Sequence, residues 1–299
     1  KRQTDNGVIW TGLPYLWTTE NGQRVAKLVV AGATAQVSWD YEDPDPRVVN
    51  EGGQRLRYTG TTDAYAIPQA NECITCHARE GLEAGTAPIG PKPRLLNRDY
   101  DYGSSIGVRN QLEHWCTSGF MVDCPADLST AEDLPEWNVP GSGGHMPGSG
   151  EDIEARARAY LEANCSHCHT PAGVAKSTRM NLDQWIISEG IVTPRPVNRD
   201  YGICKSPVAS GRGTGDRLYD IVPGDPMASI MHFRVGNGDD PAIRMPPIAK
   251  SVVHAEGFAL IEQWIGILPL PTTEDDNCSG ALGAVPAPLG DVLGAIPLP

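Results

Sequence analysis

Residues 73–77 read Cys-Ile-Thr-Cys-His and residues 165–169 read Cys-Ser-His-Cys-His, so the spacing C-x-x-C-H occurs twice in this chain of 299 residues. The spacing has a chemical reason. The two thiols can each form a thioether with one vinyl group of the same haem, and the residue that follows places an imidazole under the iron. The repeated motif therefore predicts two covalently bound haem c groups.

The prediction assigns a role to each motif residue. The attachment residues are Cys73 and Cys76 for the first haem, and Cys165 and Cys168 for the second. The proximal iron ligands are His77 and His169, respectively.

Other uses of a paired-cysteine motif fit the spacing less well. A single C-x-x-C-H could be a redox dithiol, half of a zinc site or a coincidence. A zinc ribbon places its two cysteine pairs roughly 15 to 20 residues apart, whereas these pairs begin at positions 73 and 165 and a histidine follows both. Two copies of the complete motif therefore favour haem.

Four further cysteines form an even set, namely Cys116, Cys124, Cys204 and Cys278. Covalent haem attachment takes place on the oxidising side of a membrane, where disulfides persist. We therefore expect two disulfides rather than four free thiols. Three pairings are possible, and the sequence does not choose among them. Pairing Cys116 with Cys124 would close a short loop, and pairing Cys204 with Cys278 would pin the end of the chain.

Composition excludes several classes of protein. The 24 basic and 37 acidic residues leave a formal charge of −13, which argues against nucleic acid or anionic lipid as a partner. No stretch reaches the roughly 18 apolar residues of a membrane span, and the first residues lack the apolar core of a signal peptide. We expect an exported, already processed protein, periplasmic or extracellular. With 33 glycines and 26 prolines, the chain should be rich in loops.

The fold class predicted from the pattern is α+β, with four parts along the chain. Residues 1–70 form a β-rich unit, in which Asn21-Gly22 marks a hairpin turn between alternating strands. Residues 71–148 form the first haem segment, with a short helix at 110–115. Residues 149–270 form the second haem segment, which is mainly α. Residues 271–299 form an extended tail rich in Pro, Gly and Ala.

The second haem segment has the element order of a class I cytochrome c. Apolar residues with helical spacing run to Asn164 and lead directly into the second motif, and a second periodic stretch covers 258–268. Between them lies Met245, followed by two prolines that stiffen its loop. We predict that the Met245 thioether is the sixth ligand of the second iron; the alternative is a methionine that fills the core.

The sixth ligand of the first iron stays open at this point. The favoured candidates are His232 and His114. His254, Met121 and Met146 are also possible, as is a residue of a second subunit.

Several blocks of sequence resemble the diheme c-type cytochrome family of Gram-negative bacteria, most members of which are known only as hypothetical exported proteins. The blocks are residues 71–77, 88–92, 96–99, 110–115, 155–161, 222–226 and 245–264. The resemblance covers roughly residues 8 to 266, and the 271–299 tail departs from it. It implies two covalent haems and export, and it names no reaction.

The expected function is one-electron transfer with redox partner proteins, without a protein acid, base or nucleophile. The alternative is a diheme peroxidase. Against it, the two motifs lie closer together in the sequence than the two haem motifs of that family, and no distal acid and glutamine pair is evident. A third hypothesis adds assembly into an extracellular conductive filament, with the 271–299 tail of one copy strapped onto the next.

Overall fold

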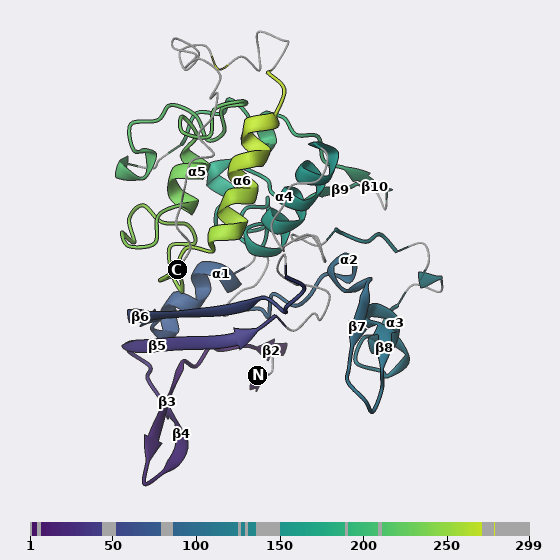
Figure 1. Cartoon of the computed structure of the whole chain (residues 1–299), viewed down its shortest axis with the longest axis vertical. Coiled ribbons are helices and arrows are strands. Elements are labelled where there is room, and N and C mark those ends of the chain that lie inside the picture. The colour runs from purple at the N-terminus through teal and green to yellow at the C-terminus, as the bar shows by residue number, and fades with distance from the viewer. Residues whose placement is uncertain are drawn as a thin grey trace.

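A computed structural model describes residues 2–4, 7–43, 52–78, 86–124, 127–128, 131–135, 150–188, 191–208, 211–270 and 278. These residues form α-helices and five small antiparallel sheets of two strands each, joined by long loops (Figure 1). The prediction of a loop-rich α+β chain is confirmed at this level.

Six strands precede the first C-x-x-C-H motif, in the part of the chain that the sequence predicts to be β-rich. Their bounds are β1 Arg2–Thr4, β2 Gly7–Ile9, β3 Tyr15–Glu20, β4 Gln23–Leu28, β5 Ala33–Glu42 and β6 Arg57–Ile67. They pair in sequence order as three antiparallel hairpins. The turn between β3 and β4 is Asn21-Gly22, with φ values of 50° and 77°, the backbone conformation that a two-residue hairpin turn requires. The predicted turn is confirmed.

The β5–β6 hairpin lies beneath the helices in Figure 1, and the β3–β4 hairpin extends away from them. A β-bulge interrupts the β5–β6 register between Ala35 and Val37. The Trp39 indole ring packs against Gly60 across this hairpin. A Cβ at position 60 would lie 2.2 Å from a carbon of that ring. The hairpin therefore needs a residue without a side chain at that point.

The segment after β6 contains short elements. They are α1 Ile74–His77, α2 Pro93–Leu96, β7 Asp99–Asp101, β8 Val108–Asn110 and α3 Gln111–Thr117. The Asn110 side chain accepts a hydrogen bond from the Glu113 amide at 3.1 Å and so caps α3. The short helix predicted at 110–115 is confirmed, with its first residue serving as the cap.

The remaining elements are α4 Gly150–Asn164, β9 Trp185–Ser188, β10 Ile191–Pro194, α5 Ile230–Val235 and α6 Ala255–Ile267. Helices α4 and α6 pack on each other and bury apolar side chains at helical spacing, including Ala157, Leu161, Ile261 and Trp264. Gly257 allows this close approach, because a Cβ there would lie 2.4 Å from the Tyr160 ring. Both predicted helices are confirmed.

Two disulfides join the four cysteines outside the motifs. Cys116 pairs with Cys124 at the end of α3, and Cys204 pairs with Cys278. Of the three pairings that the sequence allows, this one closes a local loop and fastens residue 278 to the main core, where both Cys204 and Cys278 are buried. The rest of the predicted 271–299 tail lies outside the described residues.

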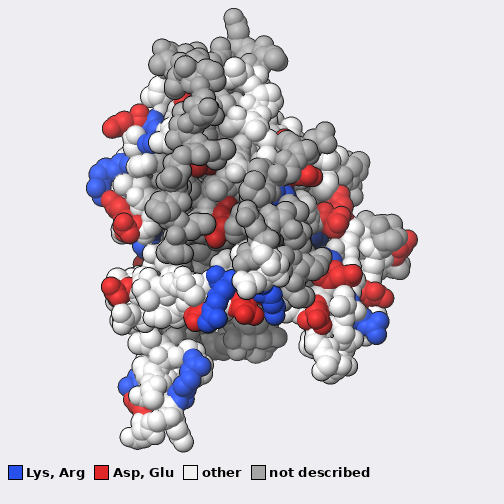
Figure 2. Space-filling model, in the orientation of Figure 1, with Lys and Arg blue, Asp and Glu red and all other residues white. Residues whose placement is uncertain are grey.

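Charged side chains are intermingled on the face drawn in Figure 2, where basic groups lie next to acidic ones. The Arg57 guanidinium donates to the Asp40 carboxylate through two nitrogens, at 2.5 and 2.6 Å. This pair holds the Asp40 pKa below its ordinary value, mainly through the hydrogen bond. Among the described helices, none is both long and apolar enough to cross a membrane.

Candidate functional site

The second C-x-x-C-H motif continues directly from the end of α4. The Cys165 amide donates to the Leu161 carbonyl at 2.8 Å, and the His169 amide donates to the Cys165 carbonyl at 3.0 Å. These bonds coil the motif into a tight turn, so that Cys165, Cys168 and His169 all line one cavity. The predicted group of second-motif residues is thus brought together at a hollow in the protein.

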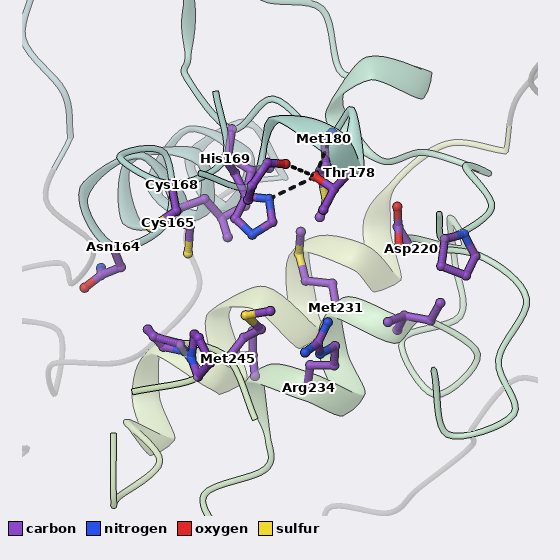
Figure 3. A pocket seen from close by; sticks show the side chains of 18 of the residues that line it. Asn164, Cys165, Cys168, His169, Thr178, Met180, Asp220, Met231, Arg234 and Met245 are labelled. Carbon is purple, nitrogen blue, oxygen red and sulfur yellow. Dashed lines mark hydrogen bonds between the residues drawn. The ribbon is translucent and has the colours of Figure 1, made fainter. Parts of the chain in front are cut away.

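The cavity has a volume of about 1000 Å³, including the part that is open to solvent. Most of its lining is apolar, with Leu161, Leu182, Pro207, Ile230, Val235 and Pro246 among the residues. The imidazole of His169 enters from one side, and the side chains of Met231 and Met245 enter from the opposite side (Figure 3). The cavity therefore places a nitrogen donor across from sulfur donors.

Hydrogen bonding leaves one nitrogen of His169 available. The Thr178 hydroxyl donates to the Ala175 carbonyl at 2.7 Å, so its oxygen can accept from His169 Nδ1, which lies 3.5 Å away. Nε2 then carries the lone pair. Burial, with a smaller effect from the positive charge of Arg234, lowers the His169 pKa to about 4. The ring is therefore neutral at pH 7 and can bind a metal.

The first motif repeats this arrangement. His77 ends α1, and its Nδ1 lies 2.8 Å from the Ala87 carbonyl oxygen. A carbonyl can only accept, so Nδ1 carries the proton and Nε2 carries the lone pair. Both motif histidines thus have the tautomer in which Nε2 is the metal-binding atom. A backbone or hydroxyl partner at Nδ1 is the usual means of orienting a ligating histidine.

All four motif thiols are free in the structure, whereas the other four cysteines form disulfides. Cys165 is partly buried, and desolvation raises its thiol pKa to about 12. A thiol in this state is protonated at neutral pH and is a poor nucleophile towards disulfides. Free thiols at all four motif positions are what thioether formation requires.

Met245 lies on a loop that is held to α5. Its amide donates to the Arg234 carbonyl at 3.0 Å. The Lys250 ammonium donates to the Met245 carbonyl at 2.9 Å and to the Val235 carbonyl at 2.6 Å. These contacts fix the backbone from which the Met245 side chain enters the cavity.

Two further methionines line the same cavity, Met180 and Met231. Sequence reasoning did not select them, because neither is followed by proline and Met231 lies within a short helix, where a methionine ordinarily fills the core. Met231 is nearly fully buried. Its place opposite His169 makes it the alternative to Met245 as a sulfur donor.

The two motifs meet each other, although they are far apart in sequence. The Cys168 thiol lies 3.4 Å from the Thr75 carbonyl oxygen. The Cys76 sulfur, the Cys168 sulfur and a ring nitrogen of His167 all lie within 4.8 Å of one another. Hydrogen bonds from Cys168 and then from His167 lower the Cys76 pKa to about 5. Nothing in the sequence pattern indicated this contact.

A buried ion network fastens the two segments together behind the second motif. The fully buried Glu162 carboxylate on α4 accepts from the Lys92 ammonium at 2.7 Å and also from the Arg94 guanidinium. Lys92 also donates to Asp183 at 2.5 Å and to the Ser166 hydroxyl at 2.8 Å. Residues just after the first motif are thereby bonded to residues that hold the second.

The three histidines considered for the first motif lie on three different elements. His232 is buried on α5, with its ring 4.5 Å from the Phe258 ring. His114 is on α3, on the other side of the molecule from α1 (Figure 1), with its ring 4.5 Å from the Tyr102 ring. His254 precedes α6, and its Nδ1 lies 3.1 Å from the Tyr160 hydroxyl. Each of these three imidazoles contacts an aromatic ring outside the first motif.

Two other candidates were methionines. Met121 lies in the loop that the Cys116–Cys124 disulfide closes. Met146 lies outside the described residues.

Comparisons of this chain with protein-family models, curated proteins and solved structures found no match.

The cavity also contains buried charge. The Lys205 ammonium donates to the Asp220 carboxylate at 2.7 Å, and both side chains are almost fully buried. Burial raises the Asp220 pKa, although Lys205 opposes this. Arg234 lines the cavity as well. An apolar hollow with two thiols, a neutral imidazole, thioether sulfurs and cationic groups could hold a flat metal macrocycle that bears carboxylates.

Proposed function

We propose that this chain is a diheme c-type cytochrome that transfers single electrons between redox partner proteins. The proposal depends above all on the cavity at the second motif. There, Cys165, Cys168 and His169 line an apolar hollow that Met245 enters from the opposite side. This donor set suits a haem joined by two thioethers and ligated by imidazole and thioether sulfur.

The residues present fit such a group. The apolar lining would contact the macrocycle, and Lys205 and Arg234 would supply cations for its carboxylates. Thr178 would keep the His169 ring oriented and Nε2 unprotonated. Bound haem supplies an iron that changes by one electron between ferric and ferrous. The chain itself needs only to hold ligands, exclude water and set the potential, so no acid or base has to act.

The first experiment counts haems and locates them. The native protein should carry two haem masses that acid acetone does not extract. Replacing Cys165 and Cys168 by serine should remove one haem. The matched control replaces Cys116 and Cys124 by serine, which opens a disulfide and should leave two haems. An intact mass without added tetrapyrrole in the native protein would contradict the proposal.

We infer export to the periplasm or the outside of the cell, with the two disulfides as support, because disulfides persist in oxidising compartments. The charge of −13 favours redox partners with basic surfaces. Cell fractionation tests the compartment. Salt dependence of electron transfer to basic and acidic test cytochromes tests the choice of partner.

A diheme peroxidase and a filament remain testable alternatives. A peroxidase needs one iron with an open site, so robust peroxide turnover by the half-reduced protein would favour it over electron transfer alone. Assembly through the 271–299 tail stays a prediction, since residues 279–299 lie outside the described part of the chain. Negative-stain microscopy of the whole chain and of a form ending at residue 278 would test it.

A further inference from the structure

We propose that His167, a residue of the second C-x-x-C-H motif, is the second axial ligand of the iron held by the first motif. The inference rests on the proposed function and concerns a ligand that the sequence left unassigned. It follows from the way in which the two motifs meet.

The first step of the argument is proximity. His167 lies between the two cysteines of its own motif, yet a nitrogen of its ring is within 4.8 Å of the Cys76 sulfur in the first motif. The neighbouring Cys168 thiol lies 3.4 Å from the Thr75 carbonyl oxygen. Two separate contacts therefore bring the His167 turn against α1, on which Cys76 and His77 lie.

The second step compares the other histidines of the described chain, apart from the two motif-ending residues His77 and His169. His232 Nε2 faces Glu262, at 3.7 Å. His114 lies beside Tyr102, and His254 beside Tyr160. His167, by contrast, has a ring nitrogen within 4.8 Å of a sulfur of the first motif.

The third step is that the backbone around His167 is already held in place before the side chain binds iron. His167 is one residue before Cys168, and it follows Ser166, whose hydroxyl donates to the Glu162 carbonyl at 2.7 Å and accepts from Lys92. The backbone on both sides of His167 is thus fixed by the α4 end and, once haem is attached, by a covalent bond at Cys168. A ligand held in this way loses little freedom on coordination.

This assignment makes the two iron sites different. The first would have two imidazole ligands, and the second would have imidazole with the Met245 or Met231 thioether. A thioether ligand raises the reduction potential relative to a second imidazole. The first site should therefore have the lower potential, and the His167 side chain would set that difference.

The test uses the full chain with both haems attached, so that loading is verified first by intact mass. In wild-type protein, both ferric irons should be low-spin by electron paramagnetic resonance. In His167→Ala, one of the two should become high-spin, and imidazole added to the buffer should restore the low-spin signal. In His167→Met, a second sulfur-to-iron absorption band should appear.

The variants His114→Ala and His232→Ala test the two other candidate ligands of the first iron. A high-spin iron in either of them, or two low-spin irons in His167→Ala without added imidazole, would overturn the assignment while leaving the diheme proposal intact. If His167→Ala does not load haem, near-infrared magnetic circular dichroism of the wild type decides. A signal from bis-imidazole iron is expected there, and imidazole–thioether signals from both irons would overturn the assignment. A native chain without haem would instead refute the proposed function.

Discussion

Replacing Glu162 by glutamine tests whether the ion network behind the second motif holds the two segments together. The Glu162 carboxylate is fully buried and accepts from Lys92, from Arg94 and, at 2.5 Å, from the Gln184 amide. Glutamine keeps the shape but removes the negative charge. It also turns one acceptor into a donor that faces other donors, so each of the two cations loses one of its anionic partners and at least one polar group loses its acceptor.

The expected cost follows from the burial of each partner. Removing one member of a buried ion pair costs about 3–5 kcal/mol. The lower end applies here, because Lys92 and Arg94 are 27% and 18% exposed and Lys92 keeps Asp183 as a partner. We expect Glu162→Gln to lower the free energy of unfolding by about 3 kcal/mol, measured by guanidinium denaturation of the full chain followed by circular dichroism.

A matched control lies on the same helix. Glu154 forms an ion pair with Arg158 at 3.4 Å, but its side chain is 41% exposed, so Glu154→Gln should change stability by no more than about 0.5 kcal/mol. If Glu162→Gln cost as little as this control, the network would contribute nothing to joining the segments, and the reasoning would be refuted.

Three further predictions follow from other parts of the structure. Met245→Ala should abolish the sulfur-to-iron absorption band and lower the potential of one haem, whereas an unchanged spectrum would transfer the ligand role to another cavity methionine. Replacing Cys204 and Cys278 by serine opens a crosslink between residues 74 positions apart and should cost about 4 kcal/mol on the chain-entropy estimate, measured as a shift in the denaturation midpoint; a negligible shift would contradict it. The Asp40 pKa is lowered by Arg57, so this pair stabilises the hairpin above the ordinary Asp pKa and the contribution is lost as pH falls through the lowered value. Carbon-13 titration should show the low Asp40 pKa, and Arg57→Gln should return it to the ordinary range.

Local sequence signals predicted the regular elements well. The Asn21-Gly22 turn, the helix ending at Asn164 and the periodic helix around Trp264 all occur as expected. Each rests on contacts within a few residues or on a single apolar face, which a pattern of residues encodes directly. The short helix α3 begins one residue later than expected because Asn110 serves as its cap.

Contacts between distant residues could not be predicted in the same way. The approach of His167 to Cys76 depends on how α1 meets the turn that follows α4, and no local pattern encodes that contact. The partnership of Glu162 with Lys92 is similar, since a charged residue near the end of a helix reads as solvent-exposed until its tertiary partners are known. Burial of Met231 opposite His169 likewise follows from the fold of the loops.

The sequence could not identify the disulfide partners, because it allows more than one pairing. Four cysteines permit three pairings, and only the placement of Cys278 in the core beside Cys204 selects one of them. The proposal of haem attachment comes from the motif chemistry, and the free thiols and the apolar cavity agree with it.

The Cys204–Cys278 bond has a mechanical consequence. Helix α6 ends at Ile267, and the chain reaches the covalent link eleven residues later, at a position buried in the core. Tension applied to the chain beyond residue 278 would pass through the sulfur atoms into Cys204 rather than along the backbone of α6. Helix α6, which packs on α4, would thus be shielded from any pull on the end of the chain, for as long as the bond stays oxidised.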